Sequence, residues 1–153
     1  MKKIICLFTL ATICVLSAFA QKNYTSGQQS LRDNIESFLR EEGYQPSIDS
    51  DGDIKFKRQG DLFFISVSDN DSSPYYVRMS KYYNYSDNIT KSVINRYDGE
   101  INRYKMIKLL ASDNNFQLAA EMFVTNSKAF TSVFERILRA MDAAESELAD
   151  MLL

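Results

Sequence analysis

The chain has 153 residues with no histidine and two cysteines, and its formal net charge is −2. A mild acidic excess argues against a nucleic-acid partner, because such a partner selects clustered lysine and arginine. The length fits a single domain with a core of ordinary size.

The first twenty residues have the pattern of a secretory signal peptide. Two lysines precede a largely apolar run over residues 4–16, and Ala18 and Ala20 stand at the −3 and −1 positions of a cleavage site before Gln21. The run is short for a membrane span, which needs about 20 apolar residues. We therefore expect a cleaved signal peptide over residues 1–20 and an exported protein, periplasmic or extracellular, with no membrane span. An uncleaved anchor is the alternative.

Cleavage would remove Cys6 and Cys14, so residues 21–153 would contain neither cysteine nor histidine. Cleavage would also remove Lys2 and Lys3. The remaining chain would have 16 lysine and arginine residues and 20 aspartate and glutamate residues, a net charge of −4. Disulfides and thiol nucleophiles are then excluded. A serine nucleophile normally needs a base beside it, and no such pair stands out. We expect a protein that is not an enzyme and uses no cofactor.

The N-terminal part of the expected mature chain is predicted to hold one helix. Residues 21–29 are polar and show no hydrophobic periodicity, so we expect a flexible leader there. From Ser30 the apolar residues take the i, i+4, i+7, i+8 spacing of one helix face. Gly43 is expected to end this helix, because glycine adopts the left-handed conformation freely. The folded domain is thus expected to span residues 30–153.

The next segment reads as a run of strands. Asp51 and Gly52 suit a tight hairpin turn, and Gly60 and Asp61 mark a second turn. Alternating apolar residues between these turns indicate strands. The predicted strands cover residues 44–48, 53–59, 62–68 and 75–83, with a loop over 69–74.

The second half of the chain predicts a helix, a hairpin and a long terminal helix. Ser86 is the expected N-cap of the first helix, which carries Gly99 near its end. Strands are predicted over residues 104–111 and 116–124, and apolar spacing predicts one helix through residues 130–148. The order α-β-β-β-β-α-β-β-α indicates an α+β domain, with an antiparallel sheet and helices on one face.

Three segments of this order resemble the bacterial YbjN-like family, which shares the fold of type III secretion chaperones. They are Glu41 to Tyr44 running into the Asp51–Ile54 turn, Val93 to Tyr97 leading into Lys105–Leu110, and Phe116 to Phe123 before the last helix. The resemblance covers nearly all of residues 31–152. It implies a secretion-chaperone-like fold and a regulatory or chaperone-like adaptor role, without catalytic residues. Secretion chaperones act in the cytosol, so an exported variant would meet its partner outside the cytoplasm.

An interaction surface is predicted on the tyrosine-rich strand over residues 75–83. Strand alternation places Tyr76, Arg78 and Tyr82 on one face, and Leu62 and Phe64 of the preceding strand are expected to join them. Tyrosine and arginine are enriched at binding hot spots. Such a face would bind a second copy or a polypeptide of the cell envelope. The alternative is that tyrosine simply suits half-exposed strand positions.

A short stretch of alternating carboxylates begins like a calcium-binding loop: Asp49, Asp51 and Asp53. The full pattern needs glycine at the sixth position and glutamate at the twelfth, and Ile54 and Gly60 stand there. We therefore expect a solvated hairpin turn and no metal site. Asp69 and Asp71 could add a second acidic loop. The alternative function is an envelope sensor domain that binds a small ligand or calcium through these loops.

Overall fold

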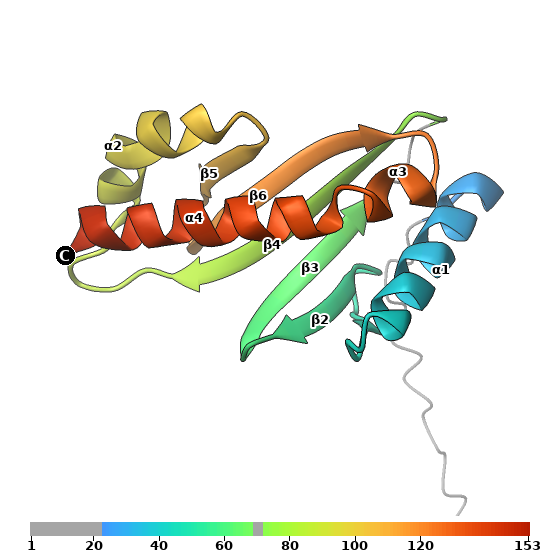
Figure 1. Ribbon diagram of the computed structural model, residues 1–153. Helices are drawn as coiled ribbons and strands as arrows, with labels where there is room; N and C mark the ends of the chain where they lie inside the picture. The colour runs from blue at the N-terminus through green and yellow to red at the C-terminus, as the bar shows by residue number, and fades with distance from the viewer. Residues whose placement is uncertain (1–22, 69–71) are drawn as a thin grey trace, which may run out of the picture.

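The computed structural model describes residues 23–68 and 72–153. It shows a six-stranded antiparallel sheet with helices packed on one face (Figure 1). This confirms the α+β class predicted from the sequence. The expected signal peptide, residues 1–20, lies outside the described residues. Within the described ranges, no helix combines the length and the apolar character that crossing a membrane requires.

The sheet has the strand order β1-β2-β3-β4-β6-β5, in which β4 and β6 are neighbours. These two strands form the longest ladder, from Tyr75 opposite Val124 to Asn84 opposite Asn115. In chain order the elements are α1 (Ser26–Glu41), β1 (Ser47–Ile48), β2 (Ile54–Arg58), β3 (Asp61–Val67), β4 (Tyr75–Asn84), α2 (Lys91–Ile101), the 3-10 helix η1 (Asn102–Tyr104), β5 (Ile107–Ala111), β6 (Asn115–Val124), α3 (Ser127–Thr131) and α4 (Phe134–Leu152).

The core lies between the helices and one face of the sheet. Alternate strand residues point into it, such as Phe56, Phe63 and Met79, which are buried. Phe38 of α1 meets Phe134 of α4 edge to face, with ring centroids 5.2 Å apart, and Phe134 lies 5.9 Å from Phe56 of the sheet. The two helices and the sheet therefore share one aromatic cluster.

Helix α1 begins earlier than predicted. Its N-cap is Thr25, whose hydroxyl accepts from the Gln28 N–H at 3.3 Å while the Gln28 side chain accepts from the Thr25 N–H at 2.8 Å. This reciprocal capping box stabilises the first turn without any apolar residue in it. Gln28 is also buried and donates to the carbonyl of Ser68. The prediction of a flexible leader over residues 21–29 was therefore wrong from Ser26 onward.

Two other helix boundaries differ from the prediction. Thr90, not Ser86, caps α2, and Ser86 forms a separate turn in which its hydroxyl accepts from the Ile89 N–H at 3.2 Å. The predicted terminal helix is divided into α3 and α4. At the break the Val133 N–H bonds to the Phe130 carbonyl, a 3-10 contact one residue shorter than the α-helical one.

The edge strand β1 is only two residues long, against the five predicted. Pro46 immediately precedes it and has no N–H to donate to β2. The predicted hairpin turn after β1 is confirmed, since Ile48 pairs with Ile54. Gly52 in that turn has φ +83°, which a residue with a side chain adopts only with strain.

Candidate interaction surface

The side of the sheet turned away from the helices is called the outer face here. One row of residues crosses it from β2 to β5, each directly opposite the next: Lys55, Phe64, Ser80, Ala119 and Lys108. No described helix lies on this side (Figure 1). The outer face is therefore a sheet surface that no described helix covers.

All five residues predicted for the interaction surface lie on the outer face: Leu62, Phe64, Tyr76, Arg78 and Tyr82. Two of them are well exposed, Leu62 at 39% and Tyr82 at 47%. Phe64 and Tyr82 meet edge to face with ring centroids 5.3 Å apart. The structure thus brings these side chains to one face, although the aromatic rings form two separate pairs.

The second pair contains a residue that the sequence analysis missed, Phe123 of β6. It is 70% exposed, and its ring lies 5.5 Å from that of Tyr76. The alternation of the sequence could have predicted this exposure. Leu118 and Ala120 belong to the alternate positions of β6 that point into the core, and Phe123 belongs to the positions between them. An apolar residue out of phase on a half-buried strand points to solvent.

An ion network ties β4, β6 and β5 together across the outer face. Glu121 contacts Arg78 at 2.9 Å and also accepts from Lys108, and Arg78 donates to the Tyr76 hydroxyl at 3.1 Å. Burial alone would raise the pKa of Glu121, but the hydrogen bond from Lys108 and the charge of Arg78 hold it below its ordinary value. The Glu121 carboxylate is therefore ionised at neutral pH and holds Arg78 in place.

A groove of about 350 Å³ adjoins the outer face where β1 stops pairing with β2. Its lining includes Tyr44, Ser47, Lys55, Lys57 and Leu62. Lys55, Lys57 and Leu62 belong to the outer face as well. The groove and the apolar residues beside it therefore form one continuous surface.

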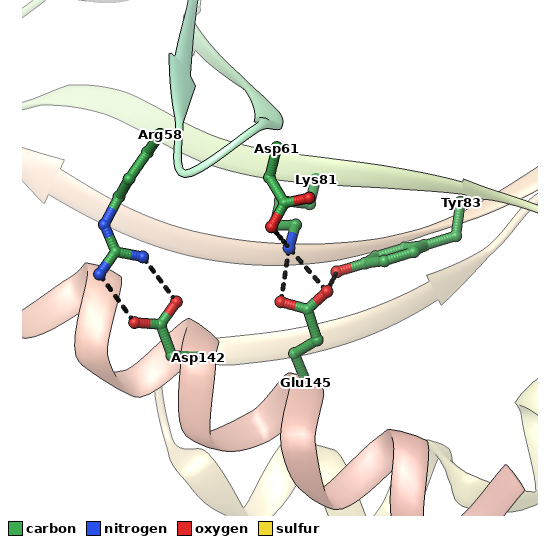
Figure 2. Close-up of polar contacts among 6 residues, drawn as sticks. All are labelled: Arg58, Asp61, Lys81, Tyr83, Asp142 and Glu145. Carbon is green, nitrogen blue, oxygen red and sulfur yellow. Dashed lines mark hydrogen bonds and ion pairs between the residues drawn. The ribbon is translucent and has the colours of Figure 1, made fainter. Parts of the chain in front are cut away.

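A second polar cluster, which was not predicted from the sequence, lies between the sheet and α4 (Figure 2). Lys81 of β4 has a side chain only 5% exposed, and it donates to Asp61 at 2.8 Å and to Glu145 of α4 at 2.6 Å. The Tyr83 hydroxyl donates to the same Glu145 at 2.8 Å. One helix turn earlier, Arg58 of β2 forms a two-pronged pair with Asp142 at 2.8 and 3.0 Å, which Figure 2 also shows.

The protonation states in this cluster favour a structural role. Burial alone would lower the pKa of Lys81, but the hydrogen bonds to Asp61 and Glu145 outweigh it and raise the pKa above its ordinary value. Burial and the Glu145 carboxylate raise the pKa of the Tyr83 phenol. A catalytic lysine needs the opposite shift, toward a neutral amine. Lys81 thus stays charged and ties α4 to the sheet.

In the predicted acidic turn, the Asp49 carboxylate bonds to the backbone of the turn itself. One oxygen of Asp49 accepts the N–H groups of Asp51 and Asp53, each at 2.9 Å, as in an Asx turn. The Gly52 carbonyl accepts from the Arg32 guanidinium. Among residues 23–68 and 72–153, no group of three or more aspartate, glutamate, histidine or cysteine side chains is placed to hold a metal ion. The other acidic candidates, Asp69 and Asp71, lie outside the described residues.

No model of a known protein family matches this chain, and no curated protein is significantly similar to it in sequence. The YbjN-like resemblance therefore stays a prediction from the quoted segments. Any assignment of function has to rest on the geometry of the outer face, the groove and the buried lysine cluster.

We predict that Lys81→Met lowers the free energy of unfolding by about 2 kcal/mol. Removing one partner of a buried pair costs ~3–5 kcal/mol, and the partial exposure of Asp61 and Glu145 reduces that loss. Urea unfolding measures the change. Lys91→Met is the matched control, because its pair with Asp113 is exposed and such pairs contribute ~1 kcal/mol or less. Equal losses in both variants would contradict a structural role for Lys81.

The lowered pKa of Glu121 predicts acid sensitivity. Because the folded state favours the ionised carboxylate, its contribution to stability is present above the unfolded pKa and is lost as pH falls through the lower folded value. Between roughly pH 5 and pH 3 the wild type should lose more stability than Glu121→Gln. Urea unfolding at both pH values tests this. Parallel pH profiles would show that the network around Glu121 does not stabilise the fold.

Proposed function

We propose that this protein is an exported, non-enzymatic binding or adaptor domain that docks a polypeptide through its outer face. The observation that carries the proposal is the exposure of Phe123, Tyr82 and Leu62 on a sheet face that no described helix covers. Large apolar side chains gathered on one face are typical of interaction sites. Tyrosine and arginine, both present here, are enriched at binding hot spots.

The absence of an enzymatic role is supported by the state of the reactive groups. Lys81, the most deeply buried lysine among the described residues, is fully engaged with Asp61 and Glu145. The expected mature chain contains neither histidine nor cysteine. The YbjN-like resemblance agrees with an adaptor or regulatory role, and the signal-peptide pattern supports a partner outside the cytoplasm.

Export predicts a defined N-terminus. When the full chain is expressed in a bacterium with an outer membrane, mass spectrometry of the periplasmic or extracellular protein should find Gln21 as the first residue. Replacing Ala18 and Ala20 with bulky charged residues should block this cleavage. A protein that keeps residues 1–20 and stays in the membrane fraction would contradict export by a cleaved signal.

A photoreactive phenylalanine analogue at position 123 tests the docking role of the outer face. It should crosslink to one protein of defined mass in the exporting cell, because Phe123 lies in the proposed contact. The adduct should disappear in the triple variant Tyr76→Ala/Arg78→Ala/Tyr82→Ala, while the circular dichroism spectrum stays unchanged.

The matched control places the same analogue at position 153, since Leu153 is exposed at the end of the chain and outside the sheet. It should yield no such adduct. No adduct at position 123, or the same adduct from both positions, would contradict docking through the outer face.

A further inference from the structure

The outer face differs in charge from the chain as a whole. The strands place four cationic side chains on it and a single carboxylate, Glu121, so the face has a net charge of +3 at neutral pH. The whole chain has a net charge of −2. The cations are Lys55, Lys57, Arg78 and Lys108. The face therefore concentrates positive charge on a protein with an acidic excess.

The longest helix shows the opposite balance. In the sequence of α4, five carboxylates stand against Arg136 and Arg139, which makes −3. Two of these carboxylates, Asp142 and Glu145, are paired with Arg58 and Lys81 of the sheet, so it is the excess of positive charge on the outer face that distinguishes the two sides of the sheet. Such a charge distribution steers oppositely charged partners toward one face.

The cations of the outer face alternate with its apolar residues. Lys55 stands directly opposite Phe64, and Lys57 stands directly opposite Leu62. No described carboxylate lies within ion-pair distance of either lysine, although both line the groove beside β2. Asp49, in the turn between β1 and β2, already accepts two backbone N–H groups. Two cations in the groove are thus available to a partner's carboxylates.

The same charges disfavour a second copy as the occupant. A two-fold dimer brings the same patch of both subunits together, so a face of +3 would meet another face of +3. Like charges across an interface cost several kcal/mol. An acidic segment would instead neutralise Lys55 and Lys57 and pack its apolar side chains on Leu62 and Phe64.

We propose that the outer face and its groove bind an acidic polypeptide segment that interleaves carboxylates with apolar side chains. This inference rests on the proposed function and adds the chemistry of the partner. The carboxylates contact Lys55 and Lys57, and the apolar side chains pack against Leu62 and the Phe64–Tyr82 pair.

Two short synthetic peptides test the inference, one alternating glutamate with valine and one alternating lysine with valine, each with a single tryptophan. The protein contains no tryptophan, so excitation of that residue reports on the peptide alone. The glutamate peptide should bind, and added salt should weaken its binding, because exposed charges are screened. The lysine peptide should not bind.

The variant Lys55→Gln/Lys57→Gln should weaken binding of the glutamate peptide about five-fold, since each exposed ion pair contributes ~0.5 kcal/mol. The matched control is Lys128→Gln/Arg136→Gln. It removes the same amount of charge from exposed positions in α3 and α4, off the outer face. The control should bind the glutamate peptide as the wild type does.

Several results would overturn the inference: equal binding of both peptides, binding of neither, or an equal loss in the control variant. Self-association of the purified protein through the outer face, seen by light scattering and lost in the Tyr76/Arg78/Tyr82 alanine variant, would also overturn it. That last result would leave docking through the outer face intact. Failure of the crosslink at position 123 would overturn the docking role itself.

Discussion

Burial of Phe134 is the contact on which the rest of the structure depends. Its ring is fully buried and meets rings from α1, the segment after it, β2 and α3: Phe38, Tyr44, Phe56 and Phe130. An aromatic side chain shared by so many elements fixes their relative positions, because protein interiors are close-packed. It sets the course of α4 across one side of the sheet and so decides which side stays uncovered.

Ion pairs between the sheet and α4 add directional contacts to this apolar packing. Lys81 with Glu145 and Arg58 with Asp142 join the sheet to successive turns of α4 (Figure 2). Such pairs contribute little net stability, but breaking the Lys81 pairs leaves a buried charge uncompensated, because that side chain is only 5% exposed. They therefore disfavour alternative positions of the helix, which the less directional apolar contacts alone would tolerate.

The uncovered side is unlike an ordinary solvated sheet face. It combines exposed rings, such as Phe123 and Tyr82, with a basic charge that the rest of the chain does not share. Apolar area supplies affinity, and a charge of one sign selects the partner and the direction of approach. This combination supports the proposed docking role, and that role requires no reactive group.

Much of the fold and of the outer face was predictable from the local pattern of the sequence. Period-two alternation alone assigned Tyr76, Arg78 and Tyr82 to one face, and turn residues such as Gly52 located the hairpins. Element boundaries failed. The start of α1 was missed because Thr25 and Gln28 stabilise its first turn by reciprocal hydrogen bonds that apolar spacing does not reveal, and β1 is shorter than predicted.

The sequence by itself determined the α+β class and the faces of the individual strands, since both follow from the spacing of apolar residues along the chain. Only the tertiary structure decided the order of the strands. That order pairs Tyr76 with Phe123 and brings Lys81 to Glu145, 64 residues later in the chain. The physical reason is that strand pairing and the burial of charges between layers join segments distant in the sequence, and local periodicity has no information about such pairs.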